Sequence, residues 1–140
     1  MKENKSHRAR ASVIVIDKNK KRFLLMYRNI SGIEKYVLLG GGVESGESIE
    51  EAAVREVREE SSLDIKLSKK LTEIKYKTCT DYVFLAEDFS GELKLSGEEI
   101  DRATRNNIYR PEWIEIKNLD KMNIPIYPKF IVKLILKEFL

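Results

Sequence analysis

The chain has one cysteine and one histidine, which narrows the chemistry it can carry. An internal disulfide is excluded because Cys79 has no partner, and this suits a reducing compartment. Cys79 lies in a run that reads as a strand, where a lone cysteine more often packs than acts as a nucleophile. His7 lies in the N-terminal tail, and we assign it no role.

Long hydrophobic runs are also missing. No apolar stretch approaches the roughly 18 residues that indicate a membrane helix, so we expect no membrane partner. The N-terminus, MKENKSHRARAS, is basic, but the VIVID run that follows is too short for the core of a signal peptide. We therefore expect a cytoplasmic protein.

Charge of one sign is not in strong excess. The net charge is +3 and the sequence pI is about 8.9, with both signs mixed along the chain. A basic patch for nucleic acid is therefore allowed but not indicated.

Repeats, low-complexity segments and linkers are absent as well, and 140 residues suit one domain, 1–140. Residues 1–8 are a candidate disordered tail. Such a chain can bury about two thirds of its unfolded surface, which is enough for a hydrophobic core.

Apolar and β-branched runs predict strands at residues 9–16, 23–27, 36–39, 65–67, 71–78, 82–86 and 113–116. The first two form a predicted hairpin around a polar turn. Residues 128–140 show helical periodicity with a lysine-rich polar face, which is typical of a helix packed on a core. Strands on both sides of a central helix predict a mixed α/β domain.

The central helix follows a glycine turn and is rich in acids. Ser48 and Glu51 make a capping box, in which the cap contributes about 1 kcal/mol. Glu56, Glu59 and Glu60 lie at i, i+3 and i+4, so they share a face and repel one another. A hard cation such as Mg²⁺, which prefers oxygen ligands, would reverse that repulsion. An acid-rich face is ordinarily just solvated, so these glutamates alone do not decide the matter.

The wider string, residues 41–63, resembles the signature of the Nudix hydrolases, which are MutT-like pyrophosphohydrolases. Gly41 is followed after five residues by Glu47, and after seven more by the run REVREE, residues 55–60. Ser62 stands where the family pattern has glycine, and Leu39 stands where many members have proline. The resemblance implies a Nudix-type α/β/α sandwich, with a mixed β-sheet between helices.

The resemblance also implies a metal site and its chemistry. Gly40, through its carbonyl, with Glu56, Glu59 and Glu60, would bind Mg²⁺, or Mn²⁺ in its place. Glu56 would also polarise the attacking water, and Arg55 would orient Glu47. Glu44 stays open between a ligand acting through water and a solvated residue.

A further acid outside the signature acts as base or ligand in several members. Glu98, Glu99 and Asp101 are the candidates here, and Glu99 is our choice among them. Each is as well explained as part of a solvated acidic loop.

Substrate contacts are expected outside the helix as well as at the glycine turn. The substrate-binding candidates are Arg8 and Arg10 for phosphate or base, Gly41 for close backbone approach, and Asn107 for the base. Asn106 and Tyr109 are further base candidates. The alternative for each of these polar side chains is that it is an ordinary surface residue and contacts no substrate.

The resemblance implies hydrolysis of a pyrophosphate bond in a nucleoside diphosphate-linked substrate, foremost a nucleoside triphosphate or related small nucleotide. ADP-ribose, dinucleoside polyphosphates and RNA ends are alternative substrates. A nucleotide-binding module without catalysis is the alternative from another class, but such modules often have broken signatures. Because members are often dimers, a homodimer is expected by analogy alone.

Overall fold

The computed structural model describes residues 7–94 and 107–139. In these segments eight strands form one sheet in the order β5-β6-β1-β2-β3-β8, with β4 paired to β1 and β7 paired to β2. The elements, in chain order, are β1 (Arg8–Asp17), β2 (Arg22–Ile30), β3 (Ile33–Val37), β4 (Leu39–Gly42), α1 (Ile49–Ser61), β5 (Asp64–Lys75), β6 (Cys79–Ser90), β7 (Asn107–Glu115), the 3-10 helix η2 (Ile116–Lys121), β8 (Ile126–Tyr127) and α3 (Phe130–Phe139).

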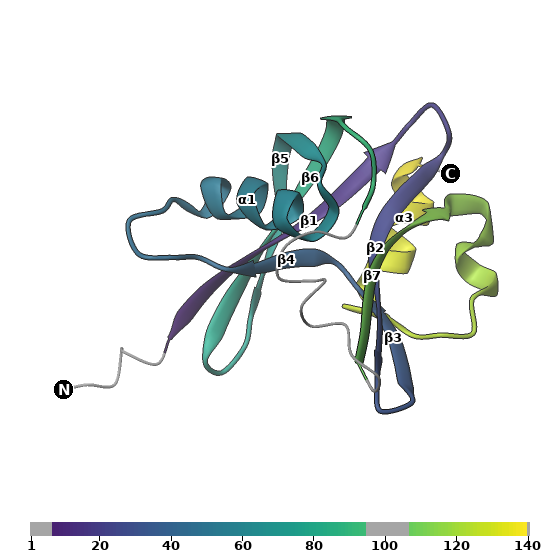
Figure 1. The fold of residues 1–140 in the computed structure, drawn as a ribbon, viewed down its shortest axis with the longest axis horizontal. Coiled ribbons are helices and arrows are strands. Elements are labelled where there is room, and N and C mark those ends of the chain that lie inside the picture. The colour runs from purple at the N-terminus through teal and green to yellow at the C-terminus, as the bar shows by residue number, and fades with distance from the viewer. Residues whose placement is uncertain (1–6, 95–106, 140) are drawn as a thin grey trace.

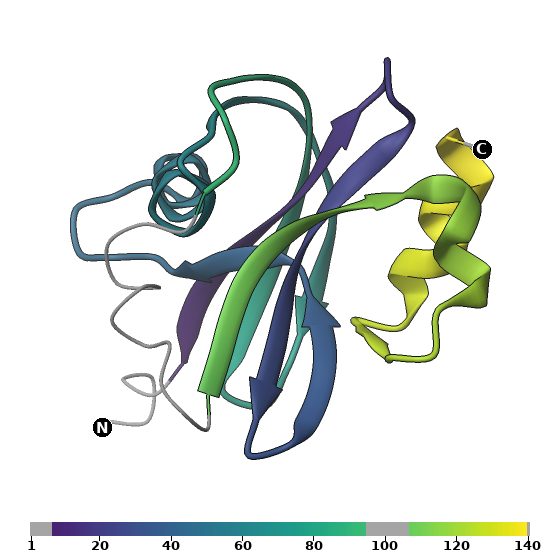
Figure 2. The same cartoon turned by 45° about the vertical axis from the view of Figure 1, so that its right-hand side comes forward.

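The sheet is mixed and lies between helices. β1 runs parallel to β6 and antiparallel to β2 and β4, and β3 runs parallel to β8. The helix α1 covers one face, while η2 and α3 cover the other (Figures 1 and 2). The predicted α/β/α sandwich is confirmed. No helix in the described segments is long and apolar enough to cross a membrane.

Alternation along β1 builds two hydrophobic cores, because successive side chains of a strand point to opposite faces. Ala11, Val13 and Val15 belong to the core under α1. Ile14 and Ile16 belong to the core under α3. The central strand therefore contributes to both cores, which explains why most of its residues are buried.

Several predicted strands are present with different limits. The hairpin is confirmed, with Ile16 opposite Phe23. The strand predicted at 36–39 is instead the junction of β3 and β4 at Leu38, because the chain leaves β2 there and joins β1. The strands predicted at 65–67 and 71–78 are largely one strand, β5, with register irregularities between the two parts.

The predicted helices are also present. Ser48 Oγ accepts from the Glu51 backbone N–H, and the Glu51 side chain accepts from the Ser48 N–H, so the capping box is confirmed. Ser62 ends α1 in the left-handed conformation, with φ of 70°. The C-terminal helix buries Ile131 and Ile135.

The conformation of Ser62 generates a stability prediction. We expect Ser62→Gly to raise the free energy of unfolding by roughly 1 kcal/mol, because the left-handed conformation costs a residue with a Cβ about that much conformational free energy, whereas glycine adopts it without this cost. A thermal melt should shift upward by about 4 °C, with activity unchanged. Ser62→Ala keeps the Cβ and serves as the control, which should not gain. An unchanged or lower melting temperature for Ser62→Gly contradicts the argument.

Candidate active site

Two glycines of β4 allow the sheet and α1 to approach closely. A Cβ added at Gly41 would lie 2.4 Å from the Glu56 carboxylate, and one at Gly40 would lie 2.1 Å from the Ala11 carbonyl oxygen. Real Cβ atoms essentially never make contacts this short, so a side chain is excluded at Gly40, where the obstacle is backbone, and at Gly41 it would force the Glu56 carboxylate to move. In Figure 1, β4 passes directly beside α1. Glu56 is thus held where the glycine strand meets the helix.

Arg55 is the centre of the polar cluster on this helix. Its Nε and Nη2 donate to the two carboxylate oxygens of Glu47, at 2.7 and 3.1 Å. Its Nη1 donates to Glu56 at 3.0 Å and to Glu59 at 3.2 Å. Its Nη2 also donates to the Gly42 carbonyl at 3.0 Å. One guanidinium therefore joins the helix, the preceding loop and β4.

This arrangement gives two neighbouring carboxyl groups opposite electrostatics. The pKa of Glu47 is lowered, chiefly because Arg55 donates to it and also because the Glu44 N–H does. Burial raises the pKa of Glu56 and outweighs the opposing contact with Arg55. The pKa of Arg55 is raised, chiefly by Glu47. Glu47 therefore stays ionised to lower pH than a free glutamate, whereas Glu56 keeps its proton to higher pH.

The three glutamates of the predicted metal face point to different partners. Glu56 and Glu59 share the Arg55 guanidinium, which offsets their mutual repulsion. Glu60 is buried and accepts the Gly40 N–H at 3.0 Å. Among the described residues, no three His, Cys, Asp or Glu side chains are already gathered as a metal site.

The donor set nevertheless fits a hard divalent cation. The side chains are carboxylates, whose oxygens are the ligands Mg²⁺ prefers. Glu56 and Glu59 already converge on one positive group, the Arg55 guanidinium. The missing side chain at Gly41 leaves the Glu56 carboxylate room beside the strand.

A cleft of about 1070 Å³ opens beside Glu56. It contains Arg8, Arg10 and Glu44, so the structure brings the two predicted arginines together with the acid cluster. Its lining is His7, Arg8, Ala9, Arg10, Gly42, Val43, Glu44, Glu56, Thr78 and Cys79. A cleft with cations facing a carboxylate suits a phosphate with a bridging metal ion.

Other predicted residues lie elsewhere. Asn107 begins β7 opposite Ile30 and does not line the cleft. Gly41 lies behind Glu56 rather than in the cleft lining. Glu99, with its neighbouring candidates, falls outside the described residues.

A second cleft, of about 380 Å³, adjoins the first and shares Arg10 and Cys79 with it. Its lining is Arg10, Ser12, Val37, Leu38, Tyr76, Cys79, Asp81, Tyr127 and Pro128. Ser12 and Asp81, which both line this second cleft, were not singled out from the sequence. Alternation along the first strand places Ser12 on the face of Arg10, but nothing local indicates that Asp81 lies beside them.

Comparisons with known proteins bear on the family and the fold. The family model described as NUDIX domain matches residues 6–131. An oxidized purine nucleoside triphosphate hydrolase of Danio rerio is 32% identical over 63% of the chain and 54% of its own length. An ADP-ribose pyrophosphatase of Methanocaldococcus jannaschii is 32% identical over 77% of the chain and 62% of its own length. The chain thus spans less than two thirds of either relative.

Solved structures match the fold over nearly the whole chain. A MutT structure from work on Aliivibrio salmonicida and Vibrio cholerae has a TM-score of 0.76 at 20% identity, covering 95% of this chain and 99% of that one. A MutT protein of Burkholderia pseudomallei has a TM-score of 0.69 at 20% identity, covering 96% and 98%.

The Gly41 contact predicts a difference between adjacent glycines. We expect Gly41→Ala to lower the free energy of unfolding by about 1 kcal/mol, because the new methyl group would displace the Glu56 carboxylate from its hydrogen bond with Arg55. Gly42→Ala is the matched control, since nothing lies within 4 Å of its added Cβ. Urea unfolding of both variants tests this, and equal losses would contradict it.

The lowered pKa of Glu47 predicts a pH effect. A carboxyl group whose pKa is lowered by folding contributes its full stabilisation of the folded state at pH values above its unfolded pKa of about 4.3. That contribution is lost as the pH falls through the lower folded pKa. The urea midpoint should therefore decrease more between pH 7 and pH 3 for the wild type than for Glu47→Gln. An identical fall in the two proteins would rule out this role for the Arg55–Glu47 pair.

Proposed function

The chain belongs to the NUDIX family, and from that premise we propose that it hydrolyses a pyrophosphate bond in a small nucleotide with the help of Mg²⁺. The observation that carries the proposal is the cluster of Arg55, Glu47, Glu56 and Glu59 beside a cleft that also holds Arg10. Carboxylates and cations facing one space are what a metal-bound polyphosphate requires.

The metal would be held by carboxylates of α1. Glu56, Glu59 and Glu60 are the proposed side-chain ligands, and the Gly40 carbonyl is the proposed backbone ligand. Mn²⁺ is the alternative ion. When bound, the ion neutralises phosphate charge and lowers the pKa of bound water.

The protein's own groups supply orientation and proton transfer. Glu56 has a pKa raised by burial, which suits a general base because a base works best with a pKa near the operating pH. Arg55 holds the ionised Glu47 carboxylate through two donors and so fixes the loop before α1. Arg8 and Arg10 would bind substrate phosphate in the cleft.

The remaining residues carry weaker support. Gly41 would allow the backbone to approach the substrate closely. Glu99 stays a prediction as a further catalytic acid, and Asn107 stays a prediction as a contact to the nucleobase. Glu44 lines the cleft and lies 3.8 Å from Arg55, which is consistent with either a water-mediated ligand or a solvated residue.

A nucleoside triphosphate is the first choice of substrate. The Danio rerio relative is named for oxidized purine nucleoside triphosphates, and the structural neighbours include MutT proteins. The Methanocaldococcus jannaschii relative, named for ADP-ribose, supports ADP-ribose as the alternative. We further propose that the chain is a single cytoplasmic domain that forms a homodimer, the last by family analogy only.

Two isosteric substitutions test the catalytic proposal. We expect Glu56→Gln and Glu59→Gln each to reduce turnover of nucleoside triphosphates with Mg²⁺ by at least 100-fold, because each removes a charged ligand while keeping the side-chain shape. The assay reads pyrophosphate and phosphate release across a panel that includes ADP-ribose.

The control for this test is Glu50→Gln, an exposed acid in the first turn of the same helix. It should retain wild-type turnover. Melting temperatures of all three variants establish that they fold. Full activity of both the Glu56 and Glu59 variants would sink the proposal.

A further inference from the structure

We propose that Asp81 is the specificity-determining residue of this site and reads the base of a guanine-type nucleotide through its N–H donors. The inference rests on the proposed function, because it takes the substrate to be a nucleotide with its phosphates beside Glu56.

Asp81 is buried without a full set of hydrogen-bond donors. It is only 7% exposed, on the face of β6 that also carries Val83 and Leu85 toward the α3 core. Ser12 Oγ donates to it, with its oxygen 2.8 and 3.0 Å from the two carboxylate oxygens. Among the described residues, no other side chain or backbone N–H donates to this carboxylate.

Neither Asp81 oxygen lacks a partner, but both share the single Ser12 hydroxyl, so the carboxylate can accept further hydrogen bonds. An ionised carboxylate has about four lone-pair sites, whereas one hydroxyl supplies one hydrogen. Because Asp81 and Ser12 both line the second cleft, further donors to this carboxylate can come from a ligand there.

The second cleft has the form of a base site. Its volume of about 380 Å³ lies in the range of small-molecule pockets. Tyr76, Tyr127, Pro128, Val37 and Leu38 give it apolar and aromatic walls. A flat base could pack between such walls, with the carboxylate as the polar group that fixes its orientation.

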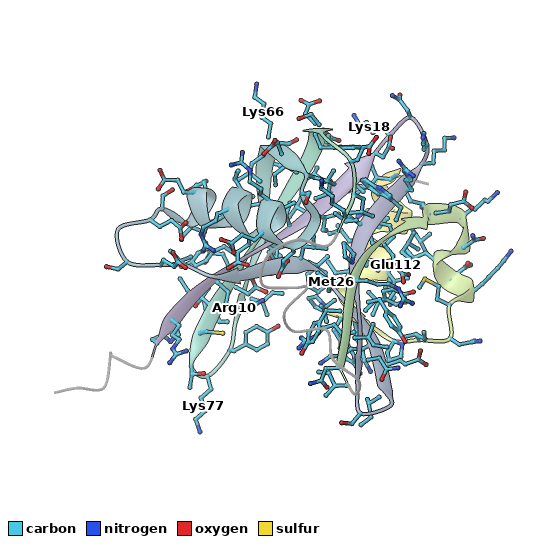
Figure 3. All side chains as sticks on the ribbon, in the orientation of Figure 1. Arg10, Lys18, Met26, Lys66, Lys77 and Glu112 are labelled. Atoms are coloured by element: carbon cyan, nitrogen blue, oxygen red, sulfur yellow. The ribbon has the colours of Figure 1, made fainter. Side chains whose placement is uncertain are left out.

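Its position relative to the phosphate cleft supports the same assignment. Arg10 and Cys79 line both clefts, so the two spaces adjoin. Arg10 is also the register partner of Asp81 on the parallel neighbouring strand. Arg10 lies on the part of β1 between α1 and the turn that carries Lys77 (Figure 3). A nucleotide can therefore place phosphate by Arg10 and its base by Asp81.

The chemistry of a carboxylate selects among purines. Guanine offers two adjacent donors, N1–H and the 2-amino group, which match two carboxylate oxygens. Hypoxanthine lacks the amino group, and xanthine has a carbonyl oxygen in its place. Adenine has an acceptor at N1. We therefore expect Asp81 to favour guanine, with Ser12 as the positioning residue that holds the carboxylate.

The test compares GTP, ITP and XTP, which differ only at position 2 of the base. For the wild type with Mg²⁺, we expect kcat/KM for GTP to exceed that for ITP and XTP at least tenfold, the effect of one bidentate base contact. Asp81→Asn turns one acceptor into a donor. The variant should lose the preference for GTP, and its kcat/KM for XTP relative to GTP should rise at least tenfold over that of the wild type. A purely structural role of Asp81 would not produce this change.

Two controls accompany it. Asp88→Asn changes an exposed acid of the same strand and should leave the GTP, ITP and XTP ratios unchanged. Ser12→Ala should weaken the GTP preference several-fold without creating a gain on XTP.

The outcomes separate this inference from the proposed function. Hydrolysis of GTP with ratios unchanged in a folded Asp81→Asn variant overturns the inference alone, as does a wild-type GTP to ITP ratio near one. If Asp81→Asn does not fold, the wild-type ratios decide. No turnover of any nucleotide sinks the proposed function, and binding of GMP against XMP to the wild type then decides the inference. Tighter GMP supports it, and equal affinity overturns it.

Discussion

The contact between the glycines of β4 and the helix α1 is the constraint on which the site depends. Without side chains at Gly40 and Gly41, the strand approaches both β1 and the Glu56 carboxylate. Glu60 then reaches the Gly40 N–H, so the helix is hydrogen-bonded to the strand it covers. A close approach of this kind buries Glu56, and that burial is what raises its pKa.

Arg55 makes such a concentration of acids tolerable. Three carboxylates, those of Glu47, Glu56 and Glu59, surround one guanidinium, so repulsion along the helix becomes a network of charge-assisted hydrogen bonds. The same network distinguishes its members, because Glu47 receives two donors from Arg55 and Glu56 is buried. The pKa of one carboxylate is lowered by its arginine partner, whereas burial raises the pKa of the other.

Much of the helix and its polar cluster could be predicted from the chain, because the interactions are local. The capping box joins residues three apart, and the carboxylates that accept hydrogen bonds from Arg55 lie within eight residues of it in the sequence. Strand limits were less predictable. The junction at Leu38 depends on which neighbour each half pairs with, and the length of β7 depends on its pairing with β2.

The amino-acid order was sufficient to identify the family and to name the acids of α1, since spacing on one helix places side chains on one face. It was not sufficient to place Ser12 beside Asp81, 69 residues away, or to join the two clefts at Arg10. These contacts arise from the parallel pairing of β1 with β6, a long-range arrangement. Whole-chain packing chooses that arrangement, because both faces of β1 must be buried under different helices.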